Sequence, residues 1–199
     1  MNYEQALKAA RRADHEICAA FRVGSRVYGT ATPESDHDFV LVLNEATCRN
    51  ELIHHPNVNV TVRGLLAFNG AIREGNIFTL ECVFAPGPAV LKSLSTLPSS
   101  IEERARRQVG FSAVERADSD FKKGIKTNNS KRIYHAFRVL DFAQQIMDCG
   151  RIRDFTTAKQ IYEDVMTEPR PLEEAFSKSF EDRRGLLRAN CERKIEKER

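Results

Sequence analysis

Residues 24–38, with the sequence GSRVYGTATPESDHD, separate two stretches of apolar residues. We predict one β-strand before this segment, at residues 17–23, and a second one after it, at residues 39–43. The second strand is nearly all apolar, which is typical of a strand that is buried on both faces. Residues 57–63 alternate apolar and polar side chains, which predicts a third strand with one exposed face. The sequence therefore predicts an α/β (α+β) fold in which a small mixed sheet with flanking helices carries the segment.

The segment brings polar groups to the ends of the first two strands. Gly24 and Ser25 open a turn, where glycine lets backbone N–H groups approach a phosphate closely and serine adds a hydroxyl donor. Asp36 and Asp38 are two residues apart, so their carboxylates point the same way on an extended chain. Two close carboxylates repel each other, and a divalent cation such as Mg²⁺ removes that cost while it binds phosphate oxygens. Each feature alone is common in turns, but their order and spacing indicate a site for a metal and a nucleoside triphosphate.

The pattern G-S-R-x-x-G-T-x-T-P-x-S-D-x-D-F resembles the signature of the DNA-polymerase-β-like nucleotidyltransferases. Within that superfamily the chain is most similar to the RNA-repair-pathway polymerase-β-like family. Phe68, GNIFTLE at residues 75–81 and KRIYHAFRVL at residues 131–140 extend the resemblance over roughly residues 17–165. The resemblance implies transfer of a nucleoside monophosphate from a nucleoside triphosphate to a hydroxyl group, with release of pyrophosphate. It also implies RNA as the acceptor, and Mg²⁺ or Mn²⁺ held by the paired aspartates.

The family uses a third acidic residue on a later strand, and the corresponding position in this chain is Asn59. No Asp or Glu occurs between residues 52 and 73. An amide oxygen is a weaker, neutral ligand and cannot act as a base at neutral pH. Three explanations stay open: activity is weakened or lost, Glu81 or Glu74 supplies the acid, or the substrate does. Glu81 is equally compatible with a structural acid that pairs with an arginine. The candidate catalytic residues are Asp36, Asp38, Asn59 and Glu81, with Asp36 and Asp38 as the metal ligands.

Beyond about residue 88 the sequence changes from short strand-like runs to long helical patterns. We predict a nucleotidyltransferase catalytic-type domain at residues 1–88 and a helical domain at 89–199, which forms a bundle that closes the nucleotide cleft. The connection around residues 86–100 is rich in Pro and Ser, with room for one short helix. The predicted helices cover residues 3–13, 65–74, 102–125, 131–148, 156–166 and 172–197.

Positive charge gathers around a predicted turn at residues 127–129. It favours either binding of a triphosphate tail or RNA backbone, or simply a solvated helix end. His135 and Arg138 lie one helical turn apart, and the resemblance favours a cleft-lining role over an ordinary core position. Arg26 is a candidate either for phosphate contact or for pairing with Asp36. The candidate nucleotide-binding residues are Gly24, Ser25, Arg26, Lys123, His135 and Arg138.

Composition excludes several other classes of protein. Of the 199 residues, 41% are hydrophobic and 30% are charged, which is typical of a soluble globular protein, and no apolar run is long enough to span a membrane. The N-terminus lacks the pattern of a secretory signal, so we expect a cytoplasmic protein. The five cysteines include no C-x-x-C pair, which indicates reduced thiols rather than disulfides or a zinc site. His54 and His55 have no acidic or cysteine partner at ligand spacing, and we interpret them as part of a loop.

Two other functions compete with transfer to RNA. Minimal nucleotidyltransferase antitoxins share G-S-x-x-x-G-x-x-x-x-x-S-D-x-D and AMPylate proteins, but they are usually shorter and lack the long helical half. The amide at Asn59 favours a pseudoenzyme that binds nucleotide or RNA without turnover. A plain structural adaptor would leave the aspartate pair and the Gly-Ser turn without a role.

Overall fold

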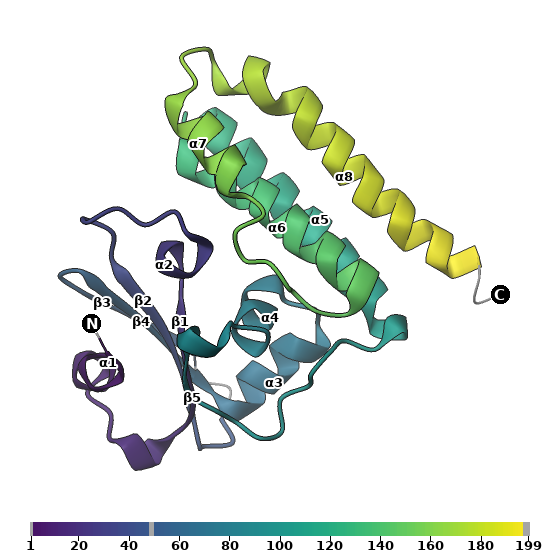
Figure 1. Cartoon of the computed structure of the whole chain (residues 1–199). Helices are drawn as coiled ribbons and strands as arrows, with labels where there is room; N and C mark the ends of the chain where they lie inside the picture. Colours follow the sequence, from purple (N-terminus) through teal and green to yellow (C-terminus); the bar gives the residue numbers. More distant parts are fainter. Residues whose placement is uncertain (1, 48–49, 197–199) are drawn as a thin grey trace. The chain divides into compact units, whose positions relative to one another are not determined.

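The structure, a computed structural model, describes residues 2–47 and 50–196 (Figure 1). The chain forms two compact units. One comprises Met1–Arg73 with Phe78–Ser99, and the other comprises Glu74–Ile77 with Ser100–Arg199. The first unit thus continues past residue 88, where the sequence placed the boundary, because a strand beyond that point belongs to its sheet.

The first unit is built on one five-stranded mixed sheet with the strand order β3-β4-β2-β1-β5. Strands β2 and β4 are parallel, and the other neighbouring pairs are antiparallel. This sheet and its flanking helices confirm the predicted fold class. The strands are β1 (Ile17–Val23), β2 (His37–Leu43), β3 (Asn50–His55), β4 (Val58–Gly64) and β5 (Val90–Lys92).

Strand β3 corrects the prediction that His54 and His55 lie in a loop. Both residues end β3, which pairs antiparallel with β4. A tight turn joins the two strands, and Asn57 in that turn has a positive φ of 63°. The sequence NELIHH does not indicate a strand because β3 is an edge strand with mostly exposed side chains and therefore lacks an apolar face.

Helices cover both faces of this sheet. Helix α1 (Tyr3–Ala10) packs on one face, against side chains that include Phe39, Leu41 and Val60. Helix α3 (Leu65–Arg73) and helix α4 (Ile77–Val83) lie on the other face, where the Phe21 and Phe68 rings stack with centroids 6.1 Å apart. The short elements of the unit are α2 (Ser25–Tyr28) and the 3₁₀ turns Asp14–Glu16 and Gly87–Ala89.

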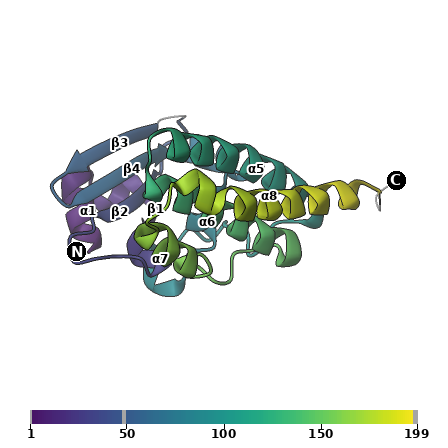
Figure 2. The ribbon, with the colours of Figure 1, turned by 90° about the horizontal axis from the view of Figure 1, so that it is seen from above.

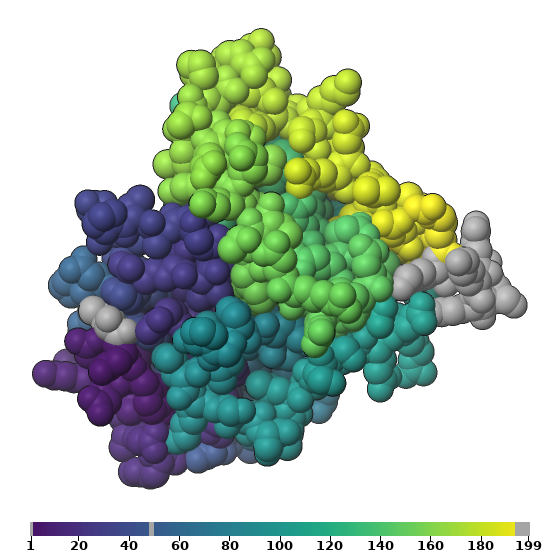
Figure 3. Space-filling model, in the orientation of Figure 1, coloured from purple at the N-terminus to yellow at the C-terminus, as the bar shows by residue number. Residues whose placement is uncertain are grey.

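The second unit is helical. It contains α5 (Glu103–Lys126), α6 (Ser130–Cys149), α7 (Lys159–Thr167) and α8 (Leu172–Glu196). Helices α5 and α6 form a hairpin, and α8 runs along both of them (Figures 1 and 2). The part of α8 that is drawn in yellow in Figure 3 lies at the surface.

Aromatic side chains fill the space between these helices. Phe121 of α5 and Phe180 of α8 stack with ring centroids 4.0 Å apart, and Phe137 of α6 contacts both rings edge-on. Gly110 lets α8 approach α5 closely, since a Cβ there would lie 2.3 Å from Cys191 Sγ. None of the helices in the described part of the chain is both long and apolar enough to cross a membrane.

Among the described residues, Cys18, Cys82, Cys149 and Cys191 form no disulfide bond. Cys48, which the sequence also predicted to be reduced, lies outside the described residues. Cys82 is buried in the sheet unit, and burial raises the pKa of its thiol. A raised pKa keeps a thiol protonated and unreactive, so Cys82 acts as a core side chain.

Candidate active site

The Gly-Ser turn forms where β1 ends and α2 begins. Gly24 has φ 81° and ψ −164°, a conformation that is almost restricted to glycine. A Cβ at this position would lie 2.2 Å from Asp38 Oδ2, so the absence of a side chain is needed for space as well. Val23, the residue before the turn, pairs with Asp38 in the β1/β2 register. The turn that opens with Ser25 is thereby fixed beside the Asp38 carboxylate.

Asp36, Asp38 and Asn59, three of the four predicted catalytic residues, lie together. Asp38 on β2 is directly opposite Asn59 on the parallel strand β4. Asn59 Nδ2 donates to Asp38 Oδ1 at 2.9 Å and to Asp36 Oδ2 at 3.2 Å. One neutral amide group therefore joins the two carboxylates.

The charges in this cluster are unbalanced. Asp36 is exposed and Asp38 is half-buried, and the amide between them supplies hydrogen bonds but no positive charge. Carboxylate and amide oxygens are the ligands that Mg²⁺ and Mn²⁺ prefer, so this donor set fits a hard divalent cation. Among the described residues there is no group of three His, Cys, Asp or Glu that could hold a metal ion. The cluster is accordingly a two-carboxylate site with an amide in the third position.

His54 belongs to this cluster, although its sequence context predicted a loop. It lies opposite Asn59 in the antiparallel β3/β4 register, and its Nδ1 is 2.7 Å from Asn59 Oδ1. The neighbouring His55 instead contacts the backbone carbonyl of Ala9 in α1 through Nε2, at 3.0 Å. Since adjacent residues of a strand point to opposite faces, only His54 faces the carboxylates. His54 could have been identified from the sequence only if β3 and its pairing with β4 had been predicted.

Glu81, the candidate substitute for the third acid, has another partner in the structure. It is 2% exposed on α4 and accepts a hydrogen bond from the Tyr28 hydroxyl on α2. This bond connects α4 to the helix that follows the Gly-Ser turn. Glu74, the other acid considered, is exposed. The structure therefore joins Glu81 to α2, and it joins the two aspartates to Asn59.

Arg26 stabilises the loop that carries the first aspartate. Its Nη2 donates to the backbone carbonyl of Ser35 at 2.7 Å. This contact is made to the backbone and not to the Asp36 carboxylate, and a role of Arg26 toward phosphate stays a prediction. Burial, and next to it the charge of Arg26, lowers the pKa of His37. A lowered pKa favours the neutral form of the His37 ring, which stacks on Phe39.

The remaining candidates lie in the helical unit. Lys123 is exposed near the end of α5. Arg138 on α6 is 1% exposed; its Nη2 donates to His135 Nδ1 at 3.3 Å, and its guanidinium lies 5.5 Å from the centre of the Phe142 ring. Burial, followed by the charge of Arg138, lowers the pKa of His135 to about 3. His135 is therefore a neutral histidine that accepts a hydrogen bond from the buried Arg138. A role of these two residues in nucleotide binding stays a prediction.

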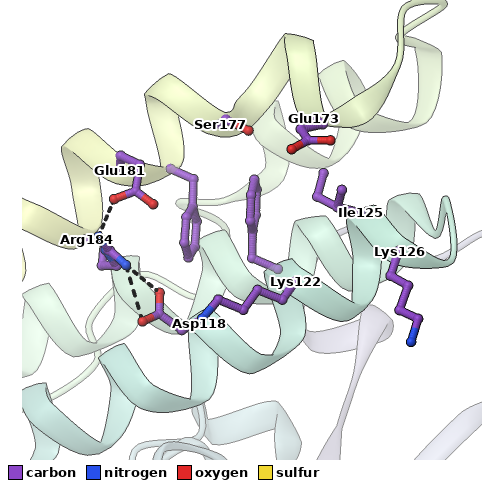
Figure 4. Close-up of a pocket in the computed structure, with 10 residues that line it drawn as sticks. Asp118, Lys122, Ile125, Lys126, Glu173, Ser177, Glu181 and Arg184 are labelled. Atoms are coloured by element: carbon purple, nitrogen blue, oxygen red, sulfur yellow. Dashed lines mark hydrogen bonds and ion pairs between the residues drawn. The ribbon is translucent and has the colours of Figure 1, made fainter.

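A separate pocket of about 330 Å³ lies between α5 and α8 (Figure 4). Phe121 and Phe180 line it, and at one end Asp118 accepts from Arg184 at 3.2 Å. Its other charged lining residues have mixed signs, with Lys122 on α5 and acidic side chains on α8. None of the predicted site residues lines this pocket.

Residues 4–67 match the family model of the nucleotidyltransferase domain. The matched segment contains the Gly-Ser turn, both aspartates and Asn59. It supports the predicted nucleotidyltransferase superfamily and nucleotidyl transfer as the general activity. Among solved structures, the chain is similar to a nucleotidyltransferase-like protein from Exiguobacterium sibiricum, with a TM-score of 0.34 and 14% identity over 96% of this chain and 73% of that one. The comparison with curated proteins gives no match.

Proposed function

We propose that the protein transfers a nucleoside monophosphate from a nucleoside triphosphate to a hydroxyl group and releases pyrophosphate. One observation carries the proposal: Asp36 and Asp38 share the Asn59 amide beside the Gly-Ser turn. This cluster lies inside the segment that matches a nucleotidyltransferase domain. The fit of its oxygen donors to a hard divalent cation supports Mg²⁺ or Mn²⁺ as the cofactor.

Each residue of the cluster has a distinct role in this proposal. Gly24 and Ser25 offer backbone N–H groups and a hydroxyl to the phosphates. Asp36 and Asp38 provide the carboxylates that orient the triphosphate through a divalent cation. Such a cation, when bound, neutralises the phosphates and stabilises the negative charge on the leaving pyrophosphate. Asn59 cannot take the proton of the attacking hydroxyl, so we expect slow transfer.

RNA is the acceptor that we propose. The resemblance of the sequence to the RNA-repair-pathway family supports it, and so does the group of basic residues at the α5–α6 turn. Part of that positive charge is already neutralised, because Arg132 pairs with the buried Asp120 of α5 at 3.3 Å. Lys123 and Lys126 at the end of α5 are exposed and remain the more suitable contacts for an RNA backbone.

Asn59 also favours a second candidate function, which is nucleotide binding without turnover. Its amide turns N–H donors toward both carboxylates, where an active enzyme of this class would have a third acid. Such a protein would bind a metal and a nucleotide but would leave the attacking hydroxyl without a base. The two candidates share the binding site and differ only in transfer.

Incubation with α-labelled nucleoside triphosphates and Mg²⁺ or Mn²⁺, in the presence of RNA or total protein, distinguishes these functions. We expect label on RNA from the wild type and none from Asp36→Asn. Label on protein instead would indicate an AMPylating enzyme of the antitoxin type. Metal-dependent nucleotide binding without any transfer would support the non-catalytic candidate. A wild-type protein that shows neither nucleotide binding nor transfer would contradict the proposal.

A further inference from the structure

The two ends of the Asn59 side-chain amide have different partners. Oδ1 lies 2.7 Å from His54 Nδ1, while Nδ2 donates to Asp36 and Asp38. A carbonyl oxygen only accepts hydrogen bonds, so the proton must lie on Nδ1 and His54 is the donor. In this arrangement Asn59 presents N–H groups to the carboxylates. It holds the two anions together but offers no oxygen to a cation.

A half-turn of the amide would exchange its two ends. Oδ1 would then face the side of Asp36 and Asp38, and Nδ2 would face His54 and need an acceptor there. Neutral imidazole can provide that acceptor if its single proton moves from Nδ1 to Nε2. The charge of the ring does not change, so His54 differs between the two arrangements only in its tautomer.

We propose that His54 is a positioning residue that determines which end of the Asn59 amide faces Asp36 and Asp38. Its Nδ1–H tautomer corresponds to the cation-free cluster, and its Nε2–H tautomer corresponds to a cluster with three oxygens available to a divalent cation. The inference rests on the proposed function, because that function assigns a cation to the carboxylate pair. It adds a residue that the sequence motif does not contain.

The sheet register supports this arrangement. His54, Asn59 and Asp38 are directly opposite one another on β3, β4 and β2. Directly opposite residues project from the same face of a sheet, with Cβ atoms close enough for their side chains to interact. The contact of His54 with Asn59 is thus built into the strand pairing. His55, one residue further along β3, contacts Ala9 on the other side and provides a matched control.

Nitrogen-15 NMR of the imidazole rings in the full chain tests the tautomer directly. At mildly alkaline pH, where imidazole is neutral, we expect His54 to carry its proton on Nδ1 without a cation and on Nε2 after addition of Mg²⁺ and a nucleoside triphosphate. His55 should not change. A His54 ring that keeps its proton on Nδ1 while the cation binds would overturn the inference and leave the proposed function intact.

Binding of Mn²⁺, measured by electron paramagnetic resonance, tests the positioning role. We expect His54→Ala to weaken Mn²⁺ binding about 10-fold, the effect typical of losing an outer-shell partner. His54→Asn should restore most of it, because its amide offers a donor or an acceptor near the position of Nδ1. His55→Ala should bind as the wild type does. Thermal unfolding of each variant verifies that it is folded.

A double-mutant cycle with Asn59→Ala separates positioning from a general structural effect. In the Asn59→Ala background, His54→Ala should cause no further loss of Mn²⁺ affinity, because the amide that it orients is gone. An equal loss in both backgrounds would overturn the inference, as would wild-type affinity in His54→Ala. A wild-type chain that binds no Mn²⁺ would contradict the proposed function itself, and this inference with it.

Discussion

At the residue scale, the site depends on close contact between the Gly-Ser turn and the second aspartate. Gly24 adopts a backbone conformation that is almost restricted to glycine, and Asp38 occupies the space where its Cβ would lie. The same aspartate is bound by Asn59. A single change at Gly24 should therefore disturb both the turn and the carboxylate pair.

We predict that Gly24→Ala weakens metal-dependent nucleotide binding by at least about 10-fold and lowers the free energy of unfolding by about 1–3 kcal/mol, the usual cost of such strain. Titration calorimetry and chemical denaturation measure the two effects. Gly70→Ala is the matched control, because a Cβ at Gly70 on α3 would have no atom within 4 Å. Unchanged binding in Gly24→Ala would mean that the turn does not contact the nucleotide.

In the proposed function, Asn59 limits the rate of transfer. We predict that Asn59→Asp raises basal transfer by about 10-fold or more, since a carboxylate restores both a charged ligand and a base for the attacking hydroxyl. The rate of label incorporation from an α-labelled nucleoside triphosphate measures the change. A lower rate in the variant would indicate that the third acid lies elsewhere in the chain.

At the scale of elements, hydrophobic pattern determined which strands could be predicted. The apolar runs of β1 and β2 and the alternation in β4 predicted these strands to within about two residues. Strand β3 lacked such a signal because it is an edge strand with exposed polar residues. Strand β5 is only three residues long, within the Pro- and Ser-rich connection. The role of His54 was hidden for the same reason, because it depends on the β3/β4 register and not on any local motif.

Helix α6 carries a neutral histidine that should make the protein sensitive to acid. Burial lowers the pKa of His135 from 6.5 to about 3, so the folded state resists a proton that the unfolded chain takes up. The stability that the folded state has with a neutral His135 is fully present above about pH 6.5 and is lost as the pH falls toward 3. Between pH 7 and pH 5 we predict a loss of roughly 1–2 kcal/mol in the free energy of unfolding.

Chemical denaturation at these two pH values, for the wild type and for His135→Gln, checks the prediction. Glutamine keeps an acceptor for Arg138 but does not titrate, so the variant should lose less stability over this range. An equal pH dependence in both proteins would show that His135 is not the group responsible.

At the scale of the whole molecule, the two units differ in how far their function follows from sequence. The family match covers residues 4–67, which lie within the sheet unit and contain the aspartates, Asn59 and the Gly-Ser turn. The motif predicted this cluster because its residues are close in sequence or fixed by strands with clear patterns. The long helices were predictable from their periodicity. The environment of their polar residues was not predictable. Arg138 is buried against the Phe142 ring, and the buried Asp120 of α5 pairs with Arg132 of α6, a contact that depends on helix packing.

We propose that this chain binds a nucleoside triphosphate through a divalent cation held by Asp36 and Asp38. Titration calorimetry of the full chain with ATP, in the presence and absence of Mg²⁺, tests it most directly. We predict that Mg²⁺ strengthens nucleotide binding in the wild type, and that Asp36→Asn abolishes this metal-dependent gain while the protein stays folded. Equal metal-dependent binding in the wild type and in Asp36→Asn would contradict the assignment of the site.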